Sequence, residues 1–429
     1  MPMRRQTTTI AVTALLATLA ACGSEGGDAA LTATTRDSAG VAIMEYPAEA
    51  WEQAPAWQLS ASPMATVGGD PNDTELDLSS SGLGTLLSDN RLVAATTIQP
   101  AQIYLFAADG SSRTLIGRAG EGPGEYRIIT GLTRLGGDTI AIYDLASRKG
   151  LLFSPEGDEV GRLQIPFTGD ASKPPQLVGR TADGMWVFRA FDQLNLPADD
   201  APEQFRNGQT ISTWREGGET LDSLMSVAGP VSVRSTVDFG GQSIPIGRPL
   251  AYGANSTQAI SGNTLWVTPG NEFTLRAYDQ TGTRIRDVRI PMATRPVTEA
   301  DREHFKQVQR EGIERARSLG IMPPQILDSE LQKIEQTPFA ENHPAIGQLT
   351  TDNIGRLWAT TGFPGVDSVL TYGVFSADGA LLGRVTVPEG IVLGASEDRV
   401  VVRREDPETG LVRLEVWGLL RVCDECETP

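Results

Sequence analysis

Carboxylates and amides in polar loops are the side chains of this sequence whose chemistry could serve a metal ion. The sequence contains no evident metal site and no evident cofactor, but Asp144, Asn255, Glu272 and Asp367 carry oxygen atoms that could serve as ligands. Carboxylates in loops are also commonly just solvated, so both interpretations stay open.

The sequence argues against a metal site built from several histidines and against a serine–histidine catalytic site. The sequence contains two histidines, His304 and His343, which excludes a zinc site built from three histidines. His343 precedes Pro344, and no nucleophile elbow lies near either histidine, so a Ser-His-Asp triad is not indicated. The catalytic residues, if the protein is an enzyme, are unknown from the sequence.

Charged and aromatic side chains in or beside the predicted loops form the set expected to face a ligand. Loops on a rigid scaffold commonly carry binding residues. The alternative for each residue is a salt bridge that fixes the local fold. The set consists of Arg118, Glu121, Glu125, Tyr126, Arg127, Asp144, Arg148, Arg189, Asp192, Glu272, Asp367 and Arg403.

The first residues have the pattern of an export signal. Two arginines precede an apolar stretch, Ile10–Ala20, that is too short to span a bilayer, and Cys22 follows Leu-Ala-Ala. This resembles the lipobox of bacterial lipoproteins, in which the signal is cleaved before an acylated cysteine. We therefore expect a lipoprotein signal peptide over 1–21, lipidation at Cys22 and a flexible tether over 22–38. An ordinary secretory signal is the alternative.

Charge and cysteine usage indicate location and partners. The net charge of −18 at pH 7 repels phosphate backbones, so no nucleic-acid partner is expected. Cys423 and Cys426, in the C-terminal tail 423–429, predict a local disulfide, with redox activity or metal binding as the alternative.

The lipid would anchor the protein in the cell envelope, in the outer membrane, facing the periplasm or the cell surface. Expected partners are that membrane and an envelope protein, peptide or glycan.

Short strands separated by tight turns recur along the sequence. Gly117–Gly157 contains a glycine-rich loop followed by three strands and their turns. Asn, Asp and Gly supply the positive φ angles that such turns require. Units of four short strands, about 40 to 45 residues long, are typical of β-propeller blades. The turns that mark the units begin at Ser88, Gly136, Ala182, Ser261, Asp352 and Ser396.

These units predict an all-β fold, a six-bladed β-propeller. The last unit lacks a fourth strand. We expect Val41–Tyr46, Trp57–Ser60 or both to supply it, because closing the ring removes exposed strand edges. Trp186, Trp266 and Trp358 recur at one blade position, which indicates packing between blades.

The insertions predict that one face is rich in loops. They fall between blades or between the second and third strands of a blade, and a propeller places both connections on the same face. Within the propeller domain, 39–422, one insertion at about 297–337 is predicted to be a helical hairpin. It has a capping box at Thr298 and Asp301 and a second helix over Ser329–Gln336. The hairpin would be a strut or a lid.

The glycine-rich loop resembles the entry of an NHL-type repeat. The whole sequence resembles bacterial six-bladed propeller lipoproteins of the NHL-repeat-like and TolB-like superfamily, through G-R-A-G-E-G-P-G-E-Y at Gly117, R-D-S-A-G-V-A-I at Arg36 and G-R-L-W at Gly355. The resemblance implies relatives that are calcium-dependent gluconolactonase-like hydrolases or a zinc-dependent amidating lyase. The hydrolases need a Glu, Asn and Asp set that converges on the central channel, to which Asp144, Asn255, Glu272 and Asp367 could belong, so calcium is a possible cofactor. The lyase needs a histidine cluster that this sequence cannot supply.

Two functions of different classes follow from these observations. The first is a binding or scaffold module for a protein, peptide or glycan on the loop-rich face, including a subunit of an envelope complex. The second is a metal-dependent hydrolase, lactonase or lyase that uses carboxylates in the central channel. A metal requirement would separate the second from the first.

Overall fold

The computed structural model describes residues 33–421 apart from 74, 98–100, 123, 167–173, 192–202, 240–241, 319–323, 364–365, 389 and 407. All of these belong to one compact unit, Leu31–Val422. None of the helices within the described residues has the length and apolar character needed to cross a membrane. The predicted signal peptide, Cys22, Cys423 and Cys426 lie outside the described residues.

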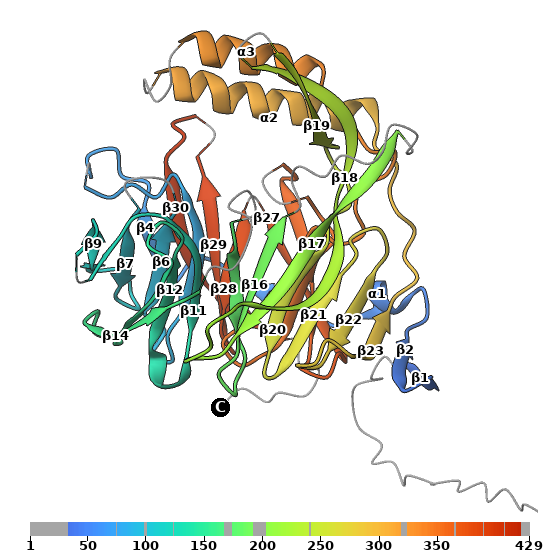
Figure 1. Ribbon diagram of the computed structural model, residues 1–429, viewed down its shortest axis with the longest axis horizontal. Coiled ribbons are helices and arrows are strands. Elements are labelled where there is room, and N and C mark those ends of the chain that lie inside the picture. Colours follow the sequence, from blue (N-terminus) through green and yellow to red (C-terminus); the bar gives the residue numbers. More distant parts are fainter. Residues whose placement is uncertain are drawn as a thin grey trace, which may run out of the picture. The chain divides into compact units, whose positions relative to one another are not determined.

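Antiparallel sheets of consecutive strands form the body of the chain (Figure 1). The first sheet contains β5 (Ser81–Leu86), β6 (Leu92–Thr96), β7 (Ile103–Phe106) and β8 (Arg113–Ile116). The second contains β11 (Ile129–Arg134), β12 (Ile140–Asp144), β13 (Lys149–Phe153) and β14 (Glu159–Gln164). The third contains β15 (Gln176–Arg180), β16 (Trp186–Phe191), β17 (Gln204–Trp214), β18 (Asp222–Phe239) and β19 (Gln242–Pro249).

The C-terminal half repeats the pattern. The fourth sheet contains β20 (Thr257–Ser261), β21 (Thr264–Thr268), β22 (Thr274–Tyr278) and β23 (Arg284–Arg289). The fifth contains β24 (Gln348–Thr351), β25 (Leu357–Thr360), β26 (Val369–Phe375) and β27 (Leu381–Pro388). The last contains β28 (Ile391–Ala395), β29 (Arg399–Glu405) and β30 (Val412–Leu420). The turns predicted from Ser88 onward each join the first and second strands of one of these sheets.

The first strands of successive sheets contact one another in a closed order: β5, β11, β15, β20, β24, β28 and again β5. Both faces of a sheet are therefore covered. In β6, Val93 and Ala95 pack toward the second sheet, whereas Leu92 and Ala94 pack toward the last. Successive side chains of a strand point to opposite faces, which explains why every residue of β6 is buried. The fold is mostly β and propeller-like.

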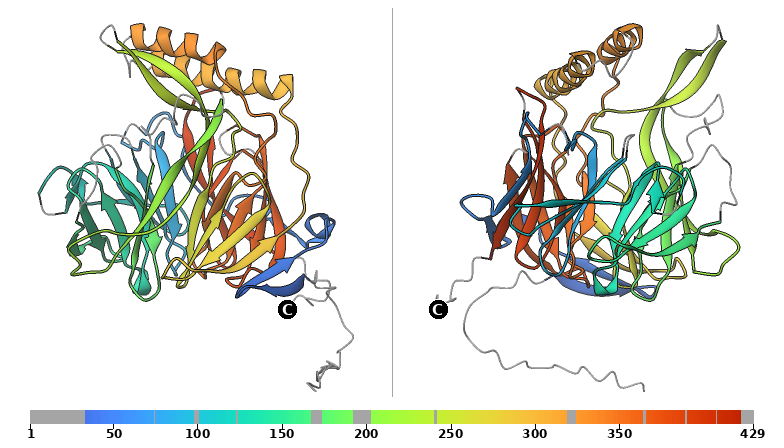
Figure 2. Two further views of the ribbon diagram at one scale, coloured as in Figure 1. Left: turned by 45° about the vertical axis from the view of Figure 1, so that its right-hand side comes forward. Right: turned by 90° about the vertical axis from the view of Figure 1, so that its left-hand side faces the viewer.

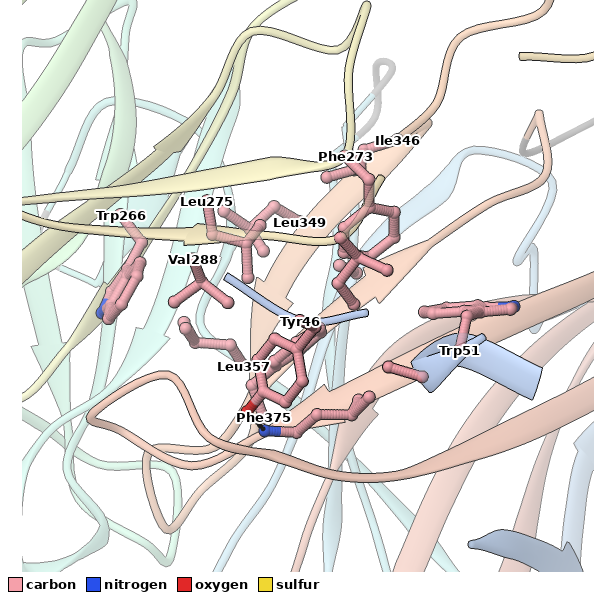
Figure 3. Close-up of a cluster of buried hydrophobic side chains, with 14 of the residues drawn as sticks. Tyr46, Trp51, Trp266, Phe273, Leu275, Val288, Ile346, Leu349, Leu357 and Phe375 are labelled. Carbon is pink, nitrogen blue, oxygen red and sulfur yellow. Dashed lines mark hydrogen bonds between the residues drawn. The ribbon is translucent and has the colours of Figure 1, made fainter. Parts of the chain in front are cut away.

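Hydrophobic clusters fill the spaces between consecutive sheets. Figure 3 shows the cluster between the fourth and fifth sheets, in which Trp266 and Val288 meet Leu357 and Phe375. The expectation that the recurring tryptophans pack between blades is confirmed. Trp186, Trp266 and Trp358 are each at most 1% exposed, and each belongs to a cluster shared by two sheets.

The N-terminal hairpin corrects the predicted tether. Residues of that tether form β1 (Thr34–Ser38), which pairs with β2 (Val41–Glu45). Ala39 and Gly40, at φ 55° and 85°, make the two-residue turn with both φ angles positive that suits a hairpin. β2 then pairs in parallel with β23, so Val41–Tyr46 extends the fourth sheet and does not complete the last one.

The predicted Trp57–Ser60 does pair with the end of the last sheet, but the strand that completes most of that sheet was not among those predicted. It is β4 (Ala65–Gly68), which pairs antiparallel with β30 and places Ala65 and Val67 in the cluster shared by the last and first sheets. β3 (Ala56–Leu59) pairs with β27 on one side and with the end of β30 on the other. Between β2 and β3, the short α1 (Ala50–Gln53) buries Trp51 against Phe273.

Two helices lie between β23 and β24, as the sequence predicts. α2 (Glu299–Ser318) begins with the expected capping box, in which the Thr298 hydroxyl and amide donate to the Asp301 carboxylate and the Asp301 amide donates back to the Thr298 hydroxyl. α3 (Pro324–Glu335) starts earlier than predicted, with proline at its first helical position, where no amide hydrogen is needed. Figure 2 shows both helices on the side of the sheets to which β18 and β19 extend.

Candidate functional site

Three cavities share lining residues. The loop-side cavity, of about 400 Å³, is bordered by Leu250, Asn255, Ile346, Gln348, Phe363 and Ile391. Gln348 also lines the channel, of about 470 Å³, which runs between the first strands of the sheets. Arg134 and Asn353 lie both on the channel and on the turn-side cavity, of about 620 Å³. Gln348 therefore marks the loop-side end of the channel, and Arg134 and Asn353 mark its turn-side end.

The turn-side end of the channel is crossed by Arg134. This side chain leaves the last residue of β11 and donates from Nη2 to the main-chain oxygen of Asn353, at 3.1 Å, in the turn of the fifth sheet. Its Nη1 lies 2.8 Å from an Asp138 carboxylate oxygen, which anchors the guanidinium. In the closed order of sheets the second and fifth are opposite one another. Arg134 therefore bridges two opposite sheets at the turn-side end of the channel.

A chain of side-chain amides starts from Arg189 at the loop-side end. Arg189 Nε donates to Gln176 Oε1 at 3.1 Å, and its Nη1 donates to Gln258 Oε1 at 3.4 Å. Gln258 Nε2 donates to Gln209 Oε1 at 3.1 Å, and Gln209 Nε2 donates to Asn255 Oδ1 at 2.8 Å. Because arginine can only donate, the oxygen of Gln258 must face it. This determines, for each amide along the chain, whether its oxygen or its nitrogen faces the neighbouring side chain.

This amide chain is buried. Gln209 is fully buried and Gln258 is 7% exposed. Burial lowers the pKa of Arg189, and no ion pair of the described residues includes it. An arginine remains cationic even when its pKa is lowered in this way. Its charge therefore polarises the amides that follow, since neighbouring hydrogen bonds strengthen one another in a low dielectric.

Gln348 supplies the second polar group of the loop-side cavity. It is the first residue of β24, and its Oε1 is buried without a hydrogen-bond donor among the described residues. Leu250, Ile346, Phe363 and Ile391 make the neighbouring walls apolar. A mostly apolar cavity with few polar groups is typical of a ligand site.

Hydrogen bonds and ring contacts connect the ribbon of β18 and β19 to the helical hairpin beside this cavity. Arg248 of β19 donates to the carbonyl oxygens of Lys333, at 2.8 Å, and Gln336, at 3.1 Å, at the end of α3. A cation is favourable there because the last carbonyls of a helix carry partial negative charge. Tyr252 contacts the ring of Phe305 from α2. The described contacts suit the predicted strut.

His343 takes part in the same contacts beside the helical hairpin. It is 7% exposed, its ring centroid lies 4.3 Å from that of Tyr252, and it sits between Arg295 and Asp301. Burial acts to raise the pKa of Asp301, but hydrogen bonds from Thr298 and Arg295, with the His343 ring 3.3 Å away, outweigh it and the pKa is lowered. His304 is exposed, as expected, and its Nε2 lies 2.9 Å from the Val366 carbonyl oxygen.

The charged residues of the glycine-rich loop pair with one another. Arg118 lies 2.5 Å from Glu125, and Arg127 lies 2.5 Å from Glu121. Tyr126, predicted to face a ligand, is instead fully buried. Its hydroxyl accepts from the Ile103 amide and donates to the Ile116 carbonyl. That prediction is wrong because the ring is needed in the core between the first two sheets.

The residues considered for calcium are held by separate partners. Asp144 is fully buried and accepts from the Ile128 and Ala146 amides and the Ser147 hydroxyl. Glu272 pairs with Arg276 at 2.9 Å, and Asp367 accepts from the Phe363 amide at 2.7 Å. Asn255 ends the amide chain. Within the described residues, no three acidic, histidine or cysteine side chains are grouped to hold a metal.

The remaining candidates lie apart from the cavity. Arg403, on β29, donates to the Ser79 carbonyl at 2.9 Å, and burial lowers its pKa. Arg148 has a positive φ of 57° in the turn after β12. Asp192 lies outside the described residues. Of the predicted set, Arg189 is linked to the loop-side cavity through the amides that end at Asn255, and Asp367 is linked to it through the amide of Phe363.

The glutamines of this site were missed from the sequence. Gln176 and Gln348 are the first residues of β15 and β24, and Gln258 is the second residue of β20. In each case the tryptophan of the same sheet follows within the next strand. This repeated placement in three consecutive units is the signal that could have revealed them.

Comparison with known proteins adds weak structural resemblances. The sequence matches none of the protein-family models and none of the curated proteins compared with it. A member of the DUF4221 family from Bacteroides vulgatus is 8% identical, with a TM-score of 0.49 over 86% of this chain and 100% of that one. An exported protein of Bacteroides fragilis is 13% identical, with a TM-score of 0.42 over 87% and 99%. A calcium-binding protein, regucalcin, from Agrobacterium tumefaciens is 9% identical, with a TM-score of 0.40 over 86% and 97%.

Proposed function

We propose that this chain is an exported, lipid-anchored six-bladed β-propeller that binds a protein, peptide or glycan at the mouth of its channel. The closed order of first strands supports the blade number, because each contacts the next and β28 returns to β5. The pairing of β4 with β30 supports closure of the last blade. Closure by a strand from the other terminus joins the two ends of the domain.

The loop-side cavity is the observation that carries the binding function. Its walls are apolar, and its two amide side chains, Asn255 and Gln348, are held at the end of an amide chain and at the start of a strand. The turn-side cavity is larger, but its arginines are already engaged, Arg134 by Asp138 and Arg421 by the Glu397 carbonyl. The few polar side chains among apolar walls favour the loop side.

The binding test uses two tryptophan variants. Ile391→Trp would fill the loop-side cavity, and Ile354→Trp, at a 54% exposed position on the turn-side cavity, is the matched control. Both proteins and the wild type are screened against a displayed peptide library and a glycan array. The proposal expects ligands that bind the wild type and Ile354→Trp but not Ile391→Trp. An unchanged ligand set for Ile391→Trp would contradict it.

The lipid anchor is tested separately. The support for it is the sequence that precedes Cys22. Expression with a radiolabelled fatty acid should label the wild type and not Cys22→Ser, while the wild type fractionates with membranes. Equal labelling of the two proteins, or none of the wild type, would contradict lipidation at Cys22.

A further inference from the structure

We propose that the loop-side cavity binds the C-terminal residue of a polypeptide, with an apolar side chain against its walls and the terminal carboxylate beside Asn255. This rests on the proposed binding function and specifies its ligand. Two partly buried arginines, the hydrogen-bond donor that Asn255 offers and the apolar walls support this ligand.

Arg189 is a partly buried cation from which the amide chain leads to the cavity. Within the described residues no ion pair includes it, and burial lowers its pKa. It donates to Gln258, and the chain continues through Gln209 to Oδ1 of Asn255. The oxygen of Asn255 is therefore occupied, and its Nδ2 makes no hydrogen bond with a described residue. This nitrogen is not one of the buried unpaired atoms, so a ligand in the cavity can reach it.

Arg206 brings a second cation close to Asn255. Its Nε donates to the Gly229 carbonyl at 2.7 Å, and its Nη2 donates to the Pro269 carbonyl at 3.0 Å. Gly270 follows Pro269 and packs so tightly that an added Cβ would lie 2.4 Å from the Asn255 carbonyl oxygen. Burial lowers the pKa of Arg206, and no ion pair in the described part of the chain includes it. Two cations without acidic partners therefore lie beside this wall of the cavity.

Acidic side chains do not neutralise these two cations. Among the described residues that line the cavity, none is acidic. Glu272 pairs with Arg276 at 2.9 Å, and Asp367 lines a separate cavity together with Arg295. A negatively charged ligand group therefore gains more at this cavity than a neutral one, although the net charge of the whole chain is −18.

The donor and the walls together select a carboxylate with an apolar substituent. Asn255 Nδ2 can only donate, and a carboxylate is an acceptor whose charge strengthens the hydrogen bond. The apolar walls would leave the hydroxyls of an acidic sugar buried without partners, which is costly. A C-terminal apolar residue carries its carboxylate and its side chain on one carbon atom. A volume of about 400 Å³ is near the lower end of typical ligand sites and suits a single terminal residue.

The test compares a C-terminal acid with its amide. N-acetyl-glycyl-glycyl-leucine and its C-terminal primary amide have the same shape and differ in charge, and both are titrated into the full mature chain by calorimetry. The wild type should bind the acid about tenfold more tightly than the amide. The preference for the acid should decrease as NaCl is raised from about 50 mM to about 500 mM, because salt screens the arginines.

Arg189 tests the contribution of the cations. Arg189→Met should weaken binding of the acid about tenfold and binding of the amide much less, whereas Arg189→Lys, which keeps the charge, should retain a preference for the acid. Arg403→Met is the matched control, because Arg403 is a partly buried arginine near the end of a second strand in another sheet, and it should leave binding unchanged. If Arg189→Met fails to fold, the acid-to-amide ratio of the wild type and its salt dependence decide the proposal.

The outcomes separate this inference from the proposed function. Equal binding of acid and amide by the wild type, abolished by Ile391→Trp, would overturn carboxylate recognition and leave a binding cavity. Binding of 4-methylpentanoate as tight as that of the peptide acid would overturn a polypeptide ligand and assign the cavity to a free carboxylic acid. Displayed ligands that bind the wild type although neither peptide does would overturn the inference alone. Failure of both peptides and of every displayed ligand to bind would overturn the inference and the proposed function together.

Discussion

Arg134 and Asn353 are joined across the channel by one hydrogen bond of 3.1 Å, from a guanidinium of the second sheet to a main-chain oxygen of the fifth. The two residues are far apart in the sequence, and the contact bridges opposite sheets at the end of the channel where the sheets have only tight turns. The cavity at the other end of the channel, on the loop-rich face, is the one at which we propose that a ligand binds.

Replacing Arg134 should loosen the turn-side end without affecting the ligand site. Arg134→Met loses the bonds to Asn353 and Asp138 and should reduce the free energy of unfolding by about 1–3 kcal/mol, measured with urea. Amides of residues 352–356 should exchange faster with deuterium. Arg91→Met is the control, since Arg91 also pairs with an aspartate and a main-chain carbonyl, but not across the channel. Equal deuterium exchange at residues 352–356 in the two variants would contradict a stabilising bridge from Arg134 to this turn.

Replacing Gln209 should show that the side-chain amides are coupled to one another through their hydrogen bonds. Gln209→Leu leaves the Asn255 oxygen without its donor and the Gln258 nitrogen with only the Ser256 carbonyl, and should cost about 1–3 kcal/mol of unfolding free energy. Gln209→Leu/Gln258→Leu should cost less than the sum of the single changes, because one change already breaks the shared bond. Gln102 accepts from the Tyr104 hydroxyl in the first sheet, outside this chain, so Gln102→Leu combined with Gln258→Leu should be additive. Additive costs in both pairs would contradict a continuous chain.

The stabilising effect of Asp301 should depend on pH in a defined direction. Its pKa is lowered in the folded protein, so its contribution is complete above the unfolded value of about 3.9 and is lost as pH falls toward the folded value. Asp301→Asn should therefore be less stable than the wild type by about 1–2 kcal/mol at pH 7, and the difference should shrink below pH 4. Glu299→Gln, at an exposed position in the same helical turn, should differ little at any pH. A deficit for Asp301→Asn that grows in acid would contradict this account.

Calcium should not stabilise the protein. Asp144, Glu272 and Asp367 are engaged with separate partners, so they do not supply a common site. Thermal unfolding in EDTA and in excess Ca²⁺ should give the same midpoint. A ligand at a hundred times its Kd stabilises by about 2.7 kcal/mol, which would be easily detected. A saturable rise with Ca²⁺ would restore the metal-dependent alternative.

Local signals in the sequence predicted much of the architecture. The Asn, Asp and Gly turns identified the first hairpin of each sheet, the recurring tryptophans identified the packing between sheets, and Thr298 with Asp301 identified the start of α2. Each of these depends on residues close together in the chain. The physical requirement at each position, a positive φ, a buried ring or a helix cap, is met by few residue types.

The features that the sequence did not predict depend on distant contacts. β4 is four residues long, and its partner strand β30 lies near the other end of the chain, so nothing local distinguishes it from a loop. Tyr126 follows charged residues and resembles a surface residue, but its ring fills the core. The site glutamines are uncharged and do not stand out until three strands bring them to one end of the channel.

The most direct test of the central claim is the response of the side-chain amide signals of Asn255 and Gln348, which line the loop-side cavity, to a ligand selected from the displayed peptide library or the glycan array. These signals are assigned in NMR spectra of the mature chain by comparison with Asn255→Leu and Gln348→Leu. The account predicts saturable shifts of both signals with one affinity, while the signal of Asn353, at the turn-side end, stays unchanged. Shifts at Asn353 instead, or saturation of the protein with neither Asn255 nor Gln348 affected, would contradict it.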